Sequence, residues 1–237
     1  MNKITSASEM FKDCTNLTTF YSNMSSLTNN AFTFEGCKNL TRFYCDLSSL
    51  SDGSEMFNKF EKLETFYSNL SSCSNSTNMF YECTALKDFD AKLDAVVTAD
   101  GMFYNCSYIV GFYNDLSSCT SAKGTFDGCS KLKNFDSDLT KIEVGDNMFS
   151  SCSSLETFES DLTSLTRAND MFKGCSKLKT FDAIMPELTN GSKMFKDCTE
   201  LETFYSKLSE LNDANDMFSA CKKLKYFRSH MDKLSTG

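Results

Sequence analysis

Apolar residues recur along this chain with a period of 23 residues. The pair Met10-Phe11 returns seven times as Met-Phe and twice as Thr-Phe, and neighbouring copies are always 23 residues apart. We number each unit from position 1 at Leu17 to position 23 at Asn39. One such unit cannot bury its apolar residues alone, so the repetition predicts coils that stack on their neighbours.

Two different spacings occur within each unit. Positions 4, 6 and 8, such as Phe20, Ser22 and Met24, are apolar or small on alternate residues, which predicts a short strand with one buried face. Positions 14, 17, 18 and 21 follow the i, i+3, i+4, i+7 spacing of one helix face and predict a short helical or 3₁₀ return. Residues with side-chain oxygens stand just before it, where a helix begins, at Thr28, Asp52, Thr98, Thr166 and Asp213.

The predicted fold is therefore an α/β repeat solenoid with the leucine-rich-repeat plan. Residues 1–237 form a single domain of ten 23-residue repeats, because no composition shift, proline-rich stretch or charge run divides the chain. Strands spaced about 4.8 Å apart would make one parallel sheet on the order of 45 Å across, on the concave face of an arc. The short helical or 3₁₀ returns would line the convex face.

The repeat resembles a known family. The run Leu-x-x-Phe-x-x-x-Leu-x-x-Leu followed by Met-Phe-x-x-Cys-x-x-Leu, as in residues 201–224, is similar to the BspA-like leucine-rich repeats. The resemblance implies a surface or secreted protein of a bacterium, protist or phage, with a role in adhesion to host proteins or cells. This chain departs from it by placing Phe at the strand core and Leu or Met where many members have Pro.

Charge and hydropathy narrow the range of partners. The net charge of −8 would repel nucleic-acid phosphates and anionic membrane surfaces, so nucleic acid is not expected as a partner. The chain contains no apolar run long enough to insert into a membrane, and residues 1–5 lack the apolar stretch of a signal peptide. The localisation at the cell surface or outside the cell is thus an implication of the family resemblance.

The twelve cysteines all fall in columns of apolar residues. Nine occupy position 21, two occupy position 11 and Cys45 occupies position 6. Phe60 stands in the first of these columns, so we interpret the column as requiring a small apolar body and predict a ladder of buried free thiols. Disulfides between adjacent units are the alternative, although side chains stacked in register rarely reach the required dihedral angle.

Candidates for catalysis or cofactor binding are few. His230 is the single histidine, and no CxxC pair or glycine-rich phosphate loop occurs, so we expect no metal, no cofactor and no enzymatic activity. The asparagine, serine and threonine content makes the N-x-S/T sequons uninformative.

The informative surface lies on the outward strand positions 3, 5 and 7. Position 7 carries mixed polar residues, among them Asp138 and Asp161. Position 5 switches between tyrosine and acid over a constant core, and its residues are our candidate ligand-binding set: Tyr21, Tyr44, Tyr67, Asp90, Tyr113, Asp136, Glu159, Asp182 and Tyr205. Exposed tyrosines favour recognition, but stacked tyrosines also stabilise a sheet. The acidic residues are explained better by a role in keeping the protein soluble than by binding of a basic partner or Ca²⁺, which is the alternative.

These observations predict a non-catalytic module that recognises a protein or glycan, such as one on a host cell, through its concave strand face. The alternative is a structural spacer or repeat arm of a longer surface or fibre protein. It is favoured by the ends, where Met1, Ile4 and Leu234 occupy apolar columns without polar caps. Uncapped ends also predict end-to-end self-association.

Overall fold

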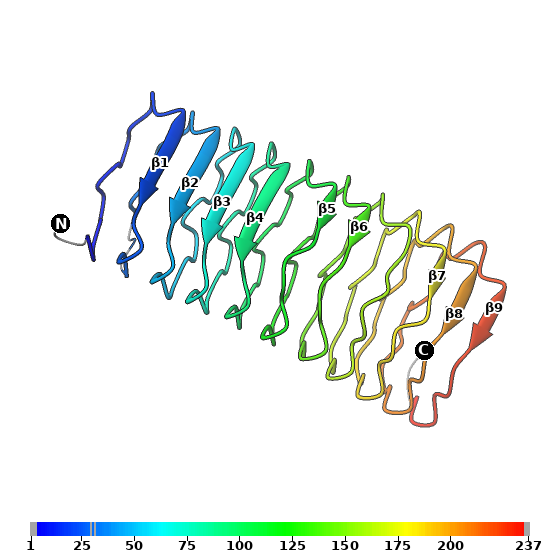
Figure 1. Cartoon of the computed structure of the whole chain (residues 1–237). Coiled ribbons are helices and arrows are strands. Elements are labelled where there is room, and N and C mark those ends of the chain that lie inside the picture. Colours follow the sequence, from blue (N-terminus) through cyan, green and yellow to red (C-terminus); the bar gives the residue numbers. More distant parts are fainter. Residues whose placement is uncertain (1–3, 29, 31, 235–237) are drawn as a thin grey trace.

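The protein is a solenoid of parallel strands. The computed structural model describes residues 4–28, 30 and 32–234. The coils follow one another in sequence order along the long axis, with the strands side by side on one face (Figure 1). The strands are β1 (Thr19–Asn23), β2 (Arg42–Asp46), β3 (Thr65–Asn69), β4 (Asp88–Lys92), β5 (Gly111–Phe112), β6 (Asn134–Phe135), β7 (Thr180–Phe181), β8 (Thr203–Tyr205) and β9 (Tyr226–Arg228).

The strand register confirms the period read from the sequence. Phe20 of β1 pairs with Phe43 of β2, and Phe43 with Phe66 of β3, always 23 residues apart. A register without slippage places every column of the repeat in a straight row along the solenoid. The strands therefore present the same positions to the core in every coil.

The strands do not form the single sheet that we predicted. They group as β1-β2-β3-β4, β5-β6 and β7-β8-β9, and position 4 of the seventh unit, Phe158, is buried without belonging to a strand. Near β5 a side chain enters the ladder, since the Leu116 N–H donates to Ser137 Oγ at 3.0 Å. In the first sheet the corresponding N–H, that of Met24, donates to the backbone oxygen of Asp46 instead. This replacement shortens the pairing of β5 with β6.

Two columns of phenylalanine fill the core. Phe57 and Phe80 of position 18 stack with centroids 5.4 Å apart and planes 1° apart, while Phe66 of position 4 meets Phe80 edge-on at 4.6 Å. This arrangement of parallel rings within a column and edge contacts between columns recurs along the solenoid. The buried apolar side chains form one cluster that runs from Ala7 to Met217.

The prediction of helical or 3₁₀ returns was wrong. None of the described residues belongs to a helix. Asn78 and Glu82, at positions 16 and 20, have φ values of 53° and 57°, and these two positions take positive φ in every described coil. The N–H of Met79 donates to Ser76 O in its own coil, while the N–H of Phe80 donates to Met102 O in the next. Helical bonding from i to i−4 is excluded by this alternation, because every second N–H is used between coils.

The residues that we expected to begin those helices have another role. Position 13, which includes Asp52, Thr98 and Asp213, forms a row of isolated parallel bridges from coil to coil. Thr166, one position earlier, donates its hydroxyl to Glu143 O of the preceding coil at 2.9 Å, and Thr28 does the same to Thr5 O at 3.1 Å. These side chains hold neighbouring coils together instead of capping a helix.

No helix among the described residues is long and apolar enough to cross a membrane. Cys14 is exposed and Cys221 is half-buried, while the other ten cysteines are buried, and all twelve are free thiols. The exposure of Cys14, which lies in the first described coil, departs from our prediction of a buried ladder. Met1, which we placed in an apolar column, lies outside the described residues.

Candidate ligand-binding face

The outward side of the strands, which we call the strand face, begins with a row of tyrosines. Tyr21, Tyr44 and Tyr67, the tyrosine file, are paired across β1, β2 and β3. The rings of Tyr44 and Tyr67 stack with centroids 5.4 Å apart, and that of Tyr21 tilts by 47° at 6.4 Å from Tyr44. Tyr21 is 86% exposed, so the file offers ring faces and hydroxyls to the solvent from hydrogen-bonded strands.

Tyr113 continues the same row after an interruption at Asp90. Its ring folds back over Gly111, where a Cβ would lie 2.7 Å from the Tyr113 ring. Gly111 thus leaves the space that the ring fills, although Tyr113 is still 67% exposed. The local sequence Gly-Phe-Tyr fixes a ring that lies along the strand face.

The acidic half of the row points outward as predicted. Asp90, Asp136, Glu159 and Asp182 are all exposed, and Tyr205 follows them on β8. The structure therefore places all nine candidate residues on the same side of the coils, with Tyr44 half-buried between its neighbours.

Position 7 has a structural role that sequence reasoning missed. Asp138 Oδ1 accepts hydrogen bonds from the Thr140 N–H at 2.8 Å and the Thr140 hydroxyl at 2.7 Å. The backbone bond from Thr140, with the hydroxyl adding to it, lowers the pKa of Asp138. Asn23, Asp46, Asn69 and Asp115 accept from the N–H two residues later in the same way. The short polar side chains of this column hold the turn that ends the strand.

Metal binding has no assembled site in the described part of the chain. No group of three or more His, Cys, Asp or Glu residues there comes close enough to hold an ion.

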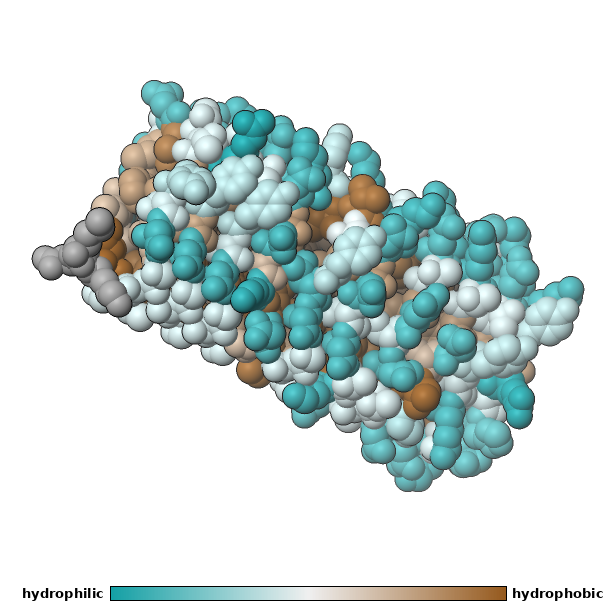
Figure 2. Space-filling model, in the orientation of Figure 1, coloured by the Kyte–Doolittle hydropathy of each residue, from teal (hydrophilic) through white to brown (hydrophobic). Residues whose placement is uncertain are grey.

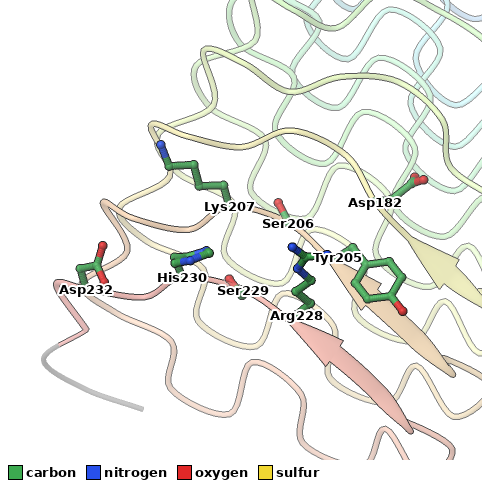
Figure 3. Close-up of a pocket in the computed structure, with 8 residues that line it drawn as sticks. All are labelled: Asp182, Tyr205, Ser206, Lys207, Arg228, Ser229, His230 and Asp232. Carbon is green, nitrogen blue, oxygen red and sulfur yellow. The ribbon is translucent and has the colours of Figure 1, made fainter.

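A pocket of about 640 Å³ lies at the C-terminal end of the strand face. Figure 3 shows its side chains rising from β8, β9 and the segments that follow β7, β8 and β9. Its lining residues are Asp182, Tyr205, Ser206, Lys207, Arg228, Ser229, His230 and Asp232. It brings together two predicted residues, Asp182 and Tyr205, with three basic side chains.

Sequence reasoning did not select Lys207, Arg228 or His230, although they stand in columns 5 and 7. A signal was present, because column 7 becomes basic in the last two units, at Lys207 and His230, and column 5 becomes basic in the last unit, at Arg228. The strand face thus consists of the tyrosine file, an acidic stretch and this mixed pocket. Figure 2 shows ring-bearing side chains of intermediate hydropathy gathered over the first strands and hydrophilic side chains beyond them.

Solved structures of several leucine-rich repeat proteins are similar to this chain. A leucine-rich repeat protein from Bacteroides ovatus is similar in structure, with 18% identity and a TM-score of 0.60, over 93% of this chain and 69% of that one. A leucine rich repeat protein from T. pallidum has 23% identity and a TM-score of 0.42, over 54% of this chain and 72% of that one. A leucine rich cell surface protein from Faecalibacterium prausnitzii has 18% identity and a TM-score of 0.48, over 85% of this chain and 62% of that one.

The likeness to the Bacteroides protein is one of fold. No curated protein matches the sequence. The family described as the BspA type leucine rich repeat region matches residues 3–110 and 120–225, with six copies. With this match over most of its length and a strand register that repeats every 23 residues, the chain belongs to the BspA-type leucine-rich-repeat family.

Proposed function

We propose that this protein is a non-catalytic binding or adhesion module that recognises a protein or glycan through its strand face. The observation that carries the proposal is the tyrosine file, whose exposed rings stand on paired strands above a constant phenylalanine core. Stiff, amphipathic rings held in place before binding offer contact area at little cost in conformational entropy. The family resemblance supports a setting on the cell surface or in a secreted or phage-associated protein.

The return side of the solenoid offers a matched control for this proposal. Tyr81 and Tyr104 stack there with centroids 4.6 Å apart, and Lys131 Nζ lies 3.4 Å from the ring centroid of Tyr108. The chain therefore carries three tyrosines with ring contacts of their own outside the candidate face.

The test compares two triple variants. The wild-type protein is screened on a glycan array and a protein array, and its strongest ligand is titrated against each variant. Changing Tyr44, Tyr67 and Tyr113 to Ser should weaken binding by about a hundredfold or more, since three aromatic anchors on the order of 1–2 kcal/mol each contribute about 3 kcal/mol or more together. Changing Tyr81, Tyr104 and Tyr108 to Ser should leave the affinity unchanged. Equal affinities for both variants would refute a role for the strand face.

A structural role as a spacer or repeat arm is the second candidate. It is supported by apolar side chains exposed at both described ends, where Met10 is 52% exposed and Phe227 is 44% exposed. At the C-terminal end, Phe218, Phe227, Met231 and Leu234 line a cavity of about 390 Å³. Buried columns that continue to an open end favour end-to-end association of copies of this chain.

Light scattering at several protein concentrations tests that association. The apparent mass should rise with concentration for the wild type and stay at that of one chain for Phe227→Glu, because the charge would be buried in the contact. A mass that does not change with concentration would exclude this second candidate. The same samples test whether residues 1–237 are a single domain, which requires one cooperative unfolding transition.

A further inference from the structure

The return segments of neighbouring coils are joined by a repeated set of backbone hydrogen bonds. The N–H of Phe80 donates to Met102 O at 2.8 Å, and that of Glu82 donates to Tyr104 O at 2.7 Å. Equivalent bonds recur at each junction from the second and third units to the eighth and ninth units. They form a continuous ladder on the side opposite the strands.

One junction lacks this ladder. Between the first and second units, no backbone hydrogen bond joins positions 12–20 of the described residues. The equivalent bonds would run from the Phe34 N–H to Met56 O and from the Gly36 N–H to Asn58 O. The strand side of the same junction is intact, since β1 and β2 pair over five residues. The two coils are therefore closed on the strand face and open on the return side.

A cavity of about 770 Å³ lies at this opening, and we call it the return-side cleft. One wall comes from the first unit and the other from the second. The rings of Phe34 and Phe57 beneath it are 6.0 Å apart, against 5.4 Å for Phe57 and Phe80 at the next junction. The lining residues include Thr33, Glu35, Gly36, Asp52, Glu55 and Asn58.

The sequence departs from its own pattern at the cleft. Phe32 takes position 16, a positive-φ position where the other units have Gly or a polar residue, with φ of 53° and 63% exposure. Phe60 takes the cysteine position. Every other described residue of that column from Cys37 onward donates its thiol to the preceding coil, as Cys83 does to Phe57 O at 3.1 Å. Local departures from a consistent pattern are expected at functional sites.

The walls of the cleft carry unpaired polar groups. The N–H groups of Phe34 and Gly36 and the backbone oxygens of Met56 and Asn58 have lost the partners that this ladder supplies elsewhere. Asn58 Oδ1 is also buried without a hydrogen-bond partner among the described residues. Backbone polar groups in native proteins are normally paired, with protein or with water, so this cleft has donors on one wall and acceptors on the other to which a ligand can bond.

An extended polypeptide backbone has the matching chemistry. It presents alternating carbonyl oxygens and N–H groups at the spacing of a strand and so can bond to both walls, as in strand addition to a sheet edge. Three acids, Glu35, Asp52 and Glu55, line the cleft with one base, Lys59. Glu35 already pairs with Lys12 at 3.0 Å and Asp52 accepts the Ser54 N–H at 2.9 Å, so Glu55 is the acid that favours a basic side chain in the occupant. The exposed ring of Phe32 at the same cleft adds an apolar contact.

We propose that the return-side cleft binds an extended, basic peptide segment of a partner protein. The segment supplies the hydrogen bonds missing between the first two units and places a basic side chain against Glu55 and its acidic neighbours. This site is independent of the strand face, so the two proposals stand or fall separately.

The test uses a phage-displayed library of random peptides, selected on the whole chain. The comparison variant combines Phe32→Gly and Phe60→Cys, which restores the residue types of the other units and should close the cleft. Selected peptides should be enriched in Lys or Arg, bind the restored variant about tenfold or more weakly, and slow hydrogen exchange at the Phe34 and Gly36 amides. Tyr44→Ser on the strand face should leave this binding unchanged.

A single substitution provides a second test in case the restored variant misfolds. Glu55→Lys lies on an exposed side chain of the cleft and should weaken the selected peptides while the thermal unfolding curve stays that of the wild type. Three results would each overturn the proposal: no enriched peptide, equal affinity for wild type and Glu55→Lys, or unchanged exchange at Phe34 and Gly36 on binding.

Discussion

The thiol of Cys106 donates a hydrogen bond of 3.1 Å to the backbone oxygen of Phe80 in the preceding coil. The same oxygen accepts the N–H of Cys83 at 3.0 Å within its own coil. Our interpretation of the cysteine column as one that needs only a small apolar body was therefore incomplete. The thiol is small enough for the core, and it also donates a hydrogen bond to the carbonyl oxygen that closes the turn of the preceding coil.

Replacement of Cys106 by Ala should destabilise the protein by about 1–2 kcal/mol. The change removes a fully buried sulfur and one weak hydrogen-bond donor, and the two losses together are of this order. Urea unfolding at pH 7 in the presence of a reductant measures the effect. Cys14→Ala is the matched control, because Cys14 is exposed and its loss should change stability by less than about 0.5 kcal/mol. If the two substitutions cost the same, the buried thiol bond does not contribute.

Stability should fall as the pH rises above 9. Burial, the largest cause, raises the pKa of Cys45 and Cys119 to about 12 and that of Cys73 to about 11, against an ordinary value of 9.0. In the unfolded chain these thiols ionise from about pH 9, while in the folded chain they stay protonated. Their contribution is therefore complete below pH 9 and is lost as the pH rises through 11 to 12.

Thermal unfolding between pH 8 and 11 measures this loss. Each thiol should contribute a slope of about 1.4 kcal/mol per pH unit from about pH 9 upwards, until the pH reaches its raised pKa. The variant Cys73→Leu with Cys119→Leu carries the residue that most other units have at position 11, and its stability should fall less steeply. An identical slope in wild type and variant would show that other groups cause the alkaline loss.

The period of the sequence predicted the stacking, the register and the core because these depend on residue type alone. Each Phe at position 18 meets the next at a fixed step, so one unit specifies its neighbours. The return was mispredicted because the i, i+3, i+4, i+7 spacing is shared by a helix and by successive turns. Gly101, Asn147 and Asp170 at position 16, residue types that adopt positive φ readily, were the available signal.

The sequence predicted which residues lie on the candidate face, but it did not predict how their side chains form a pocket. Alternation along the strands separated the tyrosines from the phenylalanines correctly. The C-terminal pocket depends on how Arg228, His230 and Tyr205 lie relative to one another across two strands, which no single column records. The short pairing of β5 with β6 likewise depends on one hydroxyl, that of Ser137, which enters the ladder.

Phe149→Ala should cost about 3–5 kcal/mol, the range for deletion of a buried phenyl ring. The ring is fully buried and stacks on Phe126 and Phe172 at 5.5 and 5.3 Å, so its loss leaves a cavity between two columns. Chemical denaturation gives the value. Phe227→Ala serves as the comparison, since its ring is partly exposed and should cost less than half as much. Equal costs would contradict a core that is continuous through Phe149.

Gly111→Thr should move a ring without unfolding the coil. Gly111 does not have positive φ, so its backbone tolerates a side chain, and the Cβ would meet the flexible Tyr113 ring instead of backbone. We expect a stability change below about 1 kcal/mol and a large shift of the Tyr113 ring signals in NMR spectra. Thr65 in the same column shows that the strand accepts threonine there. Unchanged Tyr113 signals would mean that the ring does not rest on Gly111.

The unbroken register has a consequence for how such a protein can change in length. Because Phe20 meets Phe43 and Phe43 meets Phe66 by the same step, a coil inserted or removed as a whole unit leaves every remaining junction as it was. Unequal exchange between repeats of the coding sequence can therefore lengthen or shorten the chain without disturbing its packing. Selection can then adjust the distance between the tyrosine file and the C-terminal pocket in steps of one whole coil.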